Sequence, residues 1–361
     1  MSRLLRIANR IDDGLDALRL QLRQRRMRGG AARVHAHLGF GTPTRLLVSG
    51  HVVDGSASEP TAQPATGLMA DVRAMARRYV ESNVMGARLT IRHGTAQETV
   101  VTDSDGFFSA ELAAEPKPAA GLAWPDVTVT LEHVPGSRQA PSDFAAQVMT
   151  VPAGTRFGVI SDLDDTVMDT GIHDFRRHWR KVIRSDPRLR DTFPGLPELY
   201  RALAFDSQGV QRQPIFYVSS ASWGFHEPYT RFLELHGIPR GPLFLKDYGI
   251  QGEQWFAGNH ARHKTRAIER LFDVYADMPF ILIGDSGQDD AMIYREVVAR
   301  HRGRVIAMWI RDVSADGARK ARIRALVDAV REEGVSATFD PTLLTAARDA
   351  AQAGWTAHPL R

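Results

Sequence analysis

Two kinds of hydrophobic pattern divide the chain. Between residues 45 and 135, short stretches such as 87–93 and 127–134 alternate apolar and polar side chains, and turn residues separate them. Alternation with a period of two is typical of strands that have one buried face. Beyond residue 157, near-continuous apolar runs alternate with stretches of helical spacing. Continuous runs suit strands buried on both faces, so this part is predicted to be a parallel sheet covered by helices.

These patterns assign the individual elements. In the first part, strands are predicted at 45–55, 87–93, 127–134 and 146–152, a hairpin at 98–112 and a helix at 71–82. In the second part, strands are predicted at 157–161, 214–220, 279–285 and 303–312, and helices at 196–205, 227–237, 263–276 and 290–301. A helix at 318–333 and another near 341–353 follow. The predicted fold class is α/β, a doubly wound parallel sheet preceded by a small antiparallel β-sandwich and an N-terminal helix.

The N-terminal stretch predicts a basic amphipathic helix at 1–28 that ends at Gly29-Gly30. Its apolar residues recur every three or four positions, and arginines supply positive charge. Such a helix can lie on an anionic membrane surface. Because Asp12, Asp13 and Asp16 dilute the basic face, packing of the apolar stripe on the protein itself or on a second copy is the alternative.

Length and net charge limit the number of domains and the kind of partner. A chain of 361 residues favours two main domains. The changes of pattern place the helix at 1–30, the β-sandwich domain at 31–152, the α/β domain at 153–313 and a C-terminal helical extension at 314–361. The net charge of +4 favours anionic partners only weakly.

The absence of cysteine from the sequence excludes disulfides, thiolate nucleophiles and cysteine-bound zinc. No apolar run approaches 18 residues, so no transmembrane helix is expected. Charges interrupt any apolar segment near the N-terminus, which argues against a secretory signal. We therefore expect the protein in the cytoplasm.

Polar residues cluster where the apolar runs of the second part end. Asp162-Leu163-Asp164-Asp165-Thr166 follows the first run, Ser219-Ser220 the second, and Gly284 to Asp290 the third, while Lys264 opens a predicted helix. The carboxyl ends of parallel strands meet at one edge of the sheet, where ligands bind. We expect these clusters to converge there.

The residue types suit magnesium-dependent phosphoryl transfer. Asp162 and Asp285, at the tips of two strands, could share a Mg²⁺ ion, since hard cations prefer several carboxylate oxygens. A carboxylate can attack phosphorus and form an aspartyl-phosphate. Asp164, two positions after Asp162, could act as acid and base. Ser219 could bond a phosphoryl oxygen, and Lys264 could offset negative charge.

Each cluster also has a purely structural interpretation. An Asp-rich strand end can be a turn or a helix cap. Ser219 can be a structural serine, and Lys264 a solvated residue at the start of a helix. The run "ILIGD" could carry a nucleotide-binding Asp of the Walker B type, but the chain has no G-x-x-x-x-G-K-[ST] motif. The combination, in this order and at these boundaries, favours the phosphoryl-transfer interpretation.

The order D-x-D-x-T, then Ser, then Lys, then G-D-S-G-Q-x-D resembles the haloacid dehalogenase-like (HAD-like) phosphohydrolase superfamily. The stretches "RFGVISDLDDTV", "PIFYVSSASW", "LHGIPRGPLFLKDYG", "HKTRAI", "PFILIGDSGQDDAMIY" and "GRVIAMWIRDV" resemble the catalytic domain of the actin-patch-type phosphatidate phosphatases. The resemblance covers about 156–313. The upstream "VTDSDGFFSAEL" is similar to the small β domain that often precedes this domain in bacterial members.

The resemblance implies a role for each matching residue. Asp162 would be the nucleophile and a metal ligand, and Asp164 the acid and base, with its backbone carbonyl on the metal. Ser219, or Ser220 in its place, would bind phosphate together with Lys264, and Thr166 would complete the substrate-binding set. Asp285 and Asp290 would hold Mg²⁺, with Asp289 as the alternative to Asp290, because both spacings occur in the superfamily.

The implied activity is hydrolysis of phosphatidate to diacylglycerol and phosphate at a membrane surface. The sequence differs from the family pattern in two places, which puts the identity of the substrate in question. Relatives typically read SSSPWN where residues 219–224 read SSASWG, and KDYG replaces the commoner RDWG. The basic insert at 173–193 could form a small cap, and an otherwise open site suits a bulky or membrane-bound phosphomonoester.

Two other functions stay open. One is a phosphatase for soluble or nucleic-acid-end phosphomonoesters, although the aromatic signatures of single-strand binders are not evident, so nucleic acid is not an expected partner. The other is a non-catalytic membrane or protein-binding adaptor. The sequence leaves the oligomeric state undecided.

Overall fold

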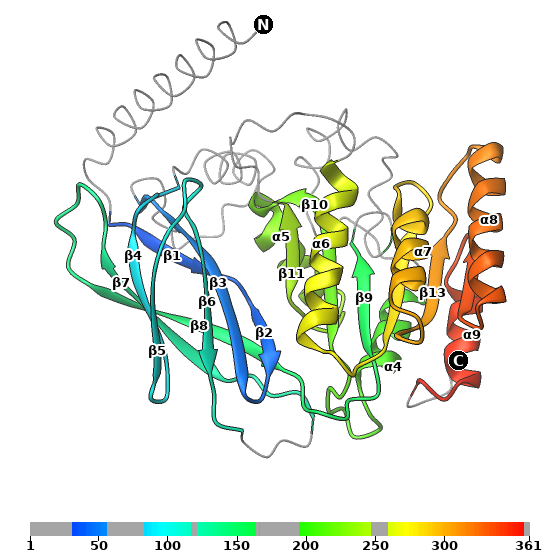
Figure 1. Ribbon diagram of the computed structural model, residues 1–361, viewed down its shortest axis with the longest axis horizontal. Helices are drawn as coiled ribbons and strands as arrows, with labels where there is room; N and C mark the ends of the chain where they lie inside the picture. Colours follow the sequence, from blue (N-terminus) through cyan, green and yellow to red (C-terminus); the bar gives the residue numbers. More distant parts are fainter. Residues whose placement is uncertain are drawn as a thin grey trace, which may run out of the picture.

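The computed structural model describes residues 31–55, 83–116, 121–163, 166, 195–246 and 259–356. These residues form a β-rich region and an α/β region that lie side by side (Figure 1). The predicted helices at 1–28 and 71–82 and the basic insert at 173–193 lie outside the described residues.

The α/β region is built on a six-stranded sheet in the order β11-β10-β9-β12-β13-β14, and every pair in it is parallel. Its strands are β9 (Gly158–Asp162), β10 (Ile215–Ser222), β11 (Leu243–Lys246), β12 (Phe280–Asp285), β13 (Val305–Arg311) and β14 (Ser336–Asp340). Every residue of the central strands β9 and β12 is buried, as the continuous apolar runs predict.

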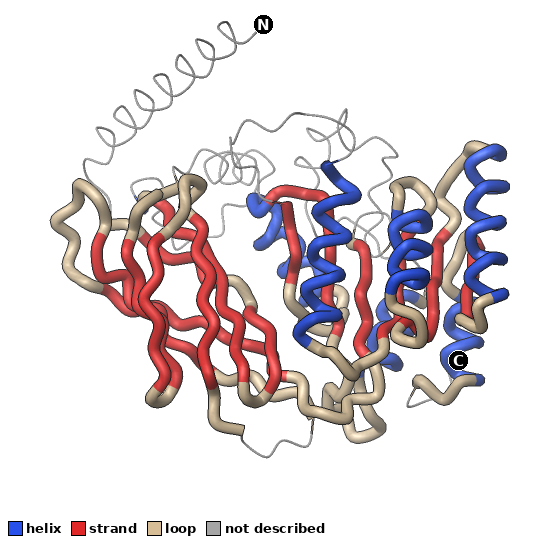
Figure 2. The backbone as a smooth tube through the Cα atoms, viewed as in Figure 1, coloured by secondary structure: helices blue, strands red, loops and turns tan. Residues whose placement is uncertain are grey.

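Helices cover both faces of this sheet (Figure 2). The helices α4 (Leu196–Ala204), α5 (His226–Leu235) and α9 (Leu344–Gln352) pack in one apolar cluster, and α6 (Asn259–Val274), α7 (Asp290–Arg300) and α8 (Gly317–Glu332) pack in another. Successive residues of a strand point to opposite faces. Val159 accordingly joins the first cluster and Ile160 the second. The sequence prediction of a mixed α/β fold is confirmed.

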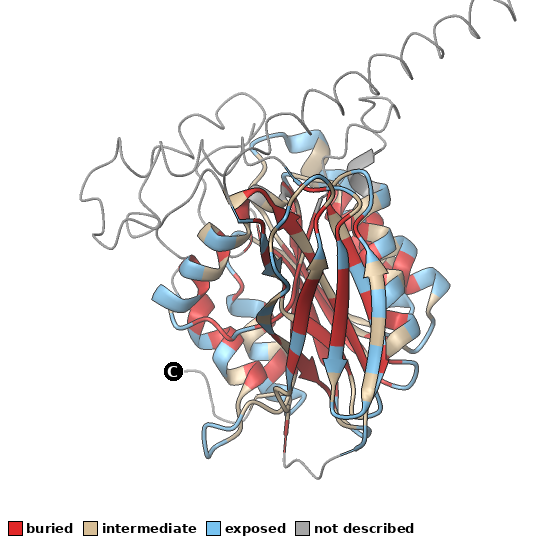
Figure 3. Cartoon of the chain, turned by 90° about the vertical axis from the view of Figure 1, so that its left-hand side faces the viewer, coloured by how far each residue is buried: buried red, intermediate tan, exposed pale blue. Residues whose placement is uncertain are grey.

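The β-rich region consists of β1 (Arg33–Ala36), β2 (Gly39–Thr42), β3 (Arg45–Val53), β4 (Arg88–His93), β5 (Ala96–Val101), β6 (Phe107–Ala113), β7 (Asp126–His133) and β8 (Ser142–Thr150). The pairing is antiparallel except between β2 and β8. Alternate residues of these strands, among them Leu46, Leu89 and Val129, are fully buried in one apolar cluster (Figure 3). In β6, the polar residues Ser109 and Glu111 between the buried positions are exposed.

The predicted hairpin at 98–112 is wrong. The turn forms as expected, because Asp103 Oδ1 accepts hydrogen bonds from the backbone N–H groups of Asp105 and Phe107, and Gly106 has a φ of 78°. However, the two flanking strands separate: β5 pairs with β4, whereas β6 pairs with β3. The alternating pattern of β6 buries Phe108, Ala110 and Leu112 against β3, which decides its partner.

Four strands were not predicted. β1, β2 and β11 have only four residues each, and β2 contains two glycines, so none gives a periodic signal. The stretch 314–361, expected to be helical only, contributes α8 and α9 at the predicted places but also β14, which extends the parallel sheet beside β13. Within the described residues, no helix is long and apolar enough to cross a membrane.

The two regions share an apolar cluster. Phe40 and Met149 of the β-rich region are buried with Phe216 and Tyr275 of the α/β region. The rings of Phe40 and Phe216 are 6.3 Å apart, and the Tyr275 hydroxyl donates a hydrogen bond of 3.2 Å to the backbone carbonyl of Gly41. The β-rich region therefore packs directly on the parallel sheet.

Histidines and aromatic rings form a second contact between the regions. His37, between β1 and β2, stacks on Trp223 with the ring centroids 3.6 Å apart and an interplanar angle of 9°. His51 of β3 lies beside His37, with its Nδ1 3.0 Å from His37 Nε2, and the ring centroids of His226 of α5 and His37 are 5.5 Å apart. This histidine cluster holds the segment that follows β10 against the β-rich region.

Candidate active site

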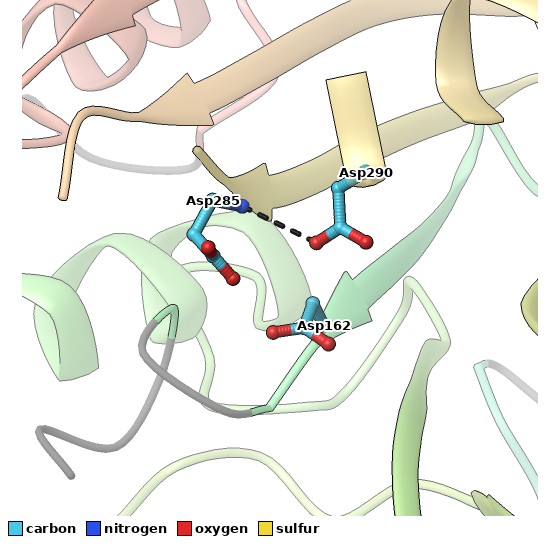
Figure 4. Close-up of side chains that lie close together, drawn as sticks. All are labelled: Asp162, Asp285 and Asp290. Atoms are coloured by element: carbon cyan, nitrogen blue, oxygen red, sulfur yellow. Dashed lines mark hydrogen bonds between the residues drawn. The ribbon is translucent and has the colours of Figure 1, made fainter. Parts of the chain in front are cut away.

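The adjacent strands β9 and β12 bring two aspartates to the same edge of the sheet. β9 ends at Asp162 and β12 ends at Asp285, and the parallel register pairs Ser161 with Ile283. Both carboxylates therefore lie beyond the last residues that pair between β9 and β12, at the carboxyl edge of the sheet (Figure 4). This is the edge at which ligands bind in open parallel sheets.

A third carboxylate completes the cluster. Asp290 is the first residue of α7, and its side chain lies beside those of Asp162 and Asp285 (Figure 4). One oxygen from each of the three carboxylates lies within 4.8 Å of the others, and all three residues are fully buried. Of the two candidates from sequence, Asp290 belongs to this cluster, whereas the side chain of Asp289 is 47% exposed and lies 3.8 Å from Arg319.

Local backbone geometry fixes the positions of Asp285 and Asp290. The N–H groups of Gly287 and Gln288 donate to Asp285 Oδ1 at 2.5 and 3.2 Å, and the N–H of Asp285 donates to Asp290 Oδ2 at 3.3 Å. A Cβ atom at Gly284 would lie 2.7 Å from Asp290 Oδ2, so only glycine leaves room for this carboxylate. The Thr166 hydroxyl, also buried, donates to Asp285 Oδ2 at 3.4 Å.

Lys264 of α6 lies between two of the carboxylates. Its Nζ donates to Asp162 Oδ1 at 2.7 Å and to Asp290 Oδ1 at 2.5 Å, and the residue is 2% exposed. Burial lowers the pKa of Lys264, but the charges of the three carboxylates outweigh it and raise the pKa above its usual range. One ammonium faces three carboxylates, which leaves two negative charges for a divalent cation to offset.

The predicted phosphate-binding serines lie on the next strand. Val218 pairs with Asp162, so Ser219 sits one position further toward the carboxyl edge of β10. It is fully buried, and its Oγ accepts a hydrogen bond of 3.0 Å from the N–H of Ala221. The Ser220 Oγ is buried without a hydrogen-bond partner among the described residues. Both hydroxyls are thus near the edge that the aspartates occupy.

The structure therefore brings Asp162, Asp285, Asp290, Lys264 and Thr166 together and places Ser219 on the neighbouring strand. Asp164 lies outside the described residues. The catalytic, substrate-binding and metal-binding roles assigned to these residues stay predictions.

Three supporting residues were not predicted. The Ser161 hydroxyl donates to the Asp162 carbonyl at 2.7 Å and lies 2.6 Å from the Tyr200 hydroxyl, and the Tyr294 hydroxyl donates to the Ile283 carbonyl at 3.0 Å. Burial raises the pKa of both tyrosines, so each hydroxyl keeps its proton. Buried polar residues in otherwise apolar elements were the available signal, but their partners depend on the tertiary fold.

Part of the α/β region is similar to a known protein family. Residues 157–312 match the model of the family described as phosphatidate phosphatase APP1, catalytic domain. The α/β region is therefore similar to APP1-type catalytic domains. The cluster of Asp162, Asp285, Asp290 and Lys264 lies within the matched residues.

Two yeast proteins are similar to parts of this chain. Phosphatidate phosphatase APP1 of Saccharomyces cerevisiae is 27% identical over 227 residues, which are 61% of this chain and 36% of that protein. An uncharacterised protein of Schizosaccharomyces pombe is 25% identical over 174 residues, which are 47% of this chain and 28% of that protein. The matched part is thus about a third or less of the curated relatives' length.

Among solved structures, a carbohydrate acetylesterase from Xanthomonas citri is 9% identical, covering 83% of this chain and 74% of that chain. Its TM-score is 0.26, which is too low to indicate a common fold.

Proposed function

We propose that the protein is a Mg²⁺-dependent phosphomonoester hydrolase that acts through an aspartyl-phosphate on Asp162. The observation that carries the proposal is the buried group of three carboxylates, with one oxygen of each within 4.8 Å of the others. Burying three like charges costs free energy unless they are compensated. A site that is used only for folding has no need of this arrangement.

The donor set fits Mg²⁺. Asp162, Asp285 and Asp290 offer carboxylate oxygens, which hard divalent cations prefer, and no sulfur or imidazole donor belongs to the described cluster. These three residues would hold the ion, with the backbone carbonyl of Asp164 as a further ligand implied by the resemblance. When bound, Mg²⁺ offsets negative charge on the phosphate and on the carboxylates.

The side chains supply the chemical steps. A carboxylate oxygen of Asp162 attacks phosphorus, the bond between phosphorus and the ester oxygen breaks, and the Asp164 carboxyl protonates the leaving oxygen. A water then gives a proton to the Asp164 carboxylate, attacks phosphorus and releases phosphate, which restores Asp162. Lys264, hydrogen-bonded to Asp162, offsets the charge of the phosphoryl group, and the hydroxyl of Ser219 or Ser220 donates to a phosphoryl oxygen.

Phosphatidate is the substrate we propose. The family description and the name of the Saccharomyces cerevisiae relative support it. The reaction would give diacylglycerol and phosphate at an anionic membrane surface, on which the basic stretch 1–28 would lie. Within this proposal the protein is cytoplasmic and peripheral to the membrane.

We also propose the finer fold assignment. The parallel order β11-β10-β9-β12-β13-β14, with helices on both faces and carboxylates after β9 and β12, supports a HAD-like doubly wound domain. The buried apolar cluster among the strands β1 to β8 supports a small β-sandwich.

The test compares substrates with and without metal. Phosphate release is measured from dispersed phosphatidate, p-nitrophenyl phosphate and an oligonucleotide 3′-phosphate, each with Mg²⁺ or with EDTA, for the wild type and for Asp162→Asn. We expect release from phosphatidate that requires Mg²⁺ and falls by at least about a hundredfold in Asp162→Asn. Release that is indifferent to EDTA or to this substitution would reject the mechanism.

The same assay separates the other functions. Activity on the oligonucleotide or on p-nitrophenyl phosphate but not on phosphatidate would indicate a different phosphomonoester. A folded wild-type protein that is inactive on all three substrates would favour the non-catalytic adaptor.

A further inference from the structure

A groove of about 630 Å³ lies between the two regions of the molecule. One wall comes from the β-rich region and includes Val100 and Val101 of β5 and Phe107 of β6. The other wall comes from the α/β region and includes Phe244 of β11 and Trp223. Its volume is in the range typical of sites for small organic ligands.

The groove follows the free edge of the parallel sheet. β11 is the outermost strand on this side and pairs only with β10 among the described strands, and Leu243, Phe244 and Leu245 all line the groove. The β-rich region faces this edge across the groove, so it shields the edge without adding a strand to it.

Apolar side chains in the groove keep contact with water. Val101 is 59% exposed, and Val100, Phe107, Trp223 and Phe244 are half-buried. A ligand that covers such apolar surface gains about 25 cal/mol of binding free energy per Å² of surface removed from water. Polar groups make up the rest of the lining, so the groove suits a ligand that has both a hydrocarbon part and a polar or charged part.

Positive charge lies along one side of the same groove. His263, Arg266 and Arg270 recur on α6 at intervals of three and four, so they share one face of the helix for about 10 Å. The Arg270 guanidinium lies 5.4 Å from the centre of the Phe40 ring, and both arginines are exposed. Asp103 is the acidic residue of the lining, and its carboxylate already accepts two backbone hydrogen bonds.

The groove connects with the candidate active site through two short pieces of chain. His263 lines the groove and precedes Lys264, whose Nζ contacts Asp162. Trp223 lines it and follows Ser219 by four residues. Only β10 and β11 separate Asp162 from this edge, which is about two strand spacings, or about 10 Å.

We propose that this groove binds one hydrocarbon chain of an anionic glycerophospholipid whose phosphate lies at Asp162. The lipid's glycerol part would cross the carboxyl ends of β10 and β11, the chain would lie against Val101, Phe107 and Phe244, and Arg266 and Arg270 would face ester oxygens or neighbouring anionic headgroups. The inference rests on the proposed phosphatase function for the position of the phosphate. It adds that the β-rich region forms part of the substrate site.

The first experiment uses chain length. The kcat/KM ratio is measured for dihexanoyl and dioctanoyl phosphatidate as monomers, and we expect a rise of about tenfold for the longer chains, because one chain buries two more CH₂ groups. Val101→Asp should reduce this ratio toward one by raising KM for the dioctanoyl substrate more than KM for the dihexanoyl substrate. Leu344→Asp, at a residue of α9 that is 57% exposed and outside the groove, is the matched control and should keep the wild-type ratio.

A chain-length ratio that Val101→Asp leaves intact would overturn the proposal. So would an equal effect of Val101→Asp and Leu344→Asp.

The second experiment does not depend on turnover. Asp162→Asn protein is irradiated with a phosphatidate that carries a diazirine in its acyl chain, and the labelled peptides are mapped. Labelling within 100–109 or 242–245 supports the groove even if the wild-type protein hydrolyses no phosphatidate. Such a lack of hydrolysis would refute only the proposed function. Labelling confined to other peptides would overturn the groove while leaving the phosphatase proposal to its own assay.

Discussion

At the scale of single residues, Lys264 lies between two carboxylates of the acidic cluster. Its ammonium is the cation that the structure places against Asp162 and Asp290, and both of its contacts are buried. Removing one partner of a buried ion pair leaves a charge without compensation, which costs far more than breaking an exposed pair. Lys264 thus has a structural role that is separable from any role in catalysis.

We predict that Lys264→Met lowers the free energy of unfolding by about 3–5 kcal/mol in EDTA, because three carboxylates then share one buried space. Mg²⁺ should recover part of this loss, since an ion that binds only the native state stabilises it. Thermal unfolding with EDTA and with Mg²⁺ measures both effects.

The matched control is Arg300→Gln, which breaks the exposed ion pairs of Arg300 with Glu296 and Glu269. We expect it to change the free energy of unfolding by less than about 1 kcal/mol with or without Mg²⁺. A Lys264→Met protein that unfolds like the wild type in EDTA would contradict the compensation argument.

At the scale of elements, α8 supports the loop between β12 and α7. Arg319, near the start of α8, donates to the backbone carbonyls of Ser286, at 2.5 Å, and Gln288. This loop supplies the N–H groups that fix Asp285. A helix outside the resemblance therefore helps to position a residue of the cluster.

Arg319→Gln should raise the Mg²⁺ concentration needed for half-maximal phosphate release several-fold, because the loop loses two charge-assisted hydrogen bonds. The melting temperature should change little. A Mg²⁺ titration of activity measures this, with Arg322→Gln, an exposed position on the same helix, as the control. Equal titration midpoints for the two variants would show that α8 does not position the cluster.

Elements also show where sequence reasoning succeeds and fails. The convergence of Asp162, Asp285 and Lys264 could be predicted, because buried parallel strands have long apolar runs and their carboxyl ends meet at one edge. Asp290 could not be separated from Asp289, since only the direction of the first turn of α7 distinguishes them. The prediction of a hairpin at 98–112 failed because turn residues determine the turn but not the strands with which the flanking strands pair.

At the scale of the whole molecule, the contact between the regions depends on uncharged histidines. Burial, with a smaller contribution from the neighbouring His35, lowers the pKa of His51 to about 3 and that of His226 to about 4. Burial also lowers the pKa of His37 well below its usual value, with smaller contributions from His51, His226 and His35. Sequence could not show this, because the histidines come from β1, the segment between β1 and β2, β3 and α5, and meet only in the folded protein.

The free energy of unfolding should therefore fall as the pH drops from about 6.5 toward 3–4. In this range the histidines bind protons in the unfolded chain but stay neutral in the folded chain. The loss should level off below these folded-state pKa values, and above about 6.5 the histidines should add no pH dependence. Urea unfolding between pH 4 and 8 measures the slope.

His51→Gln should flatten this slope over pH 4–6.5, and His133→Gln, at an exposed position of β7, should not. Identical slopes in both variants would rule out the histidine cluster as the source.

The apolar cluster shared by Phe40, Met149, Phe216 and Tyr275 has a consequence for how such proteins are dissected. A fragment cut to the 157–312 match would turn the inner sides of Phe216 and Tyr275 toward solvent and lose the cover over β11. The smallest fragment that folds stably on its own is therefore expected to be longer than the segment matched by the family model.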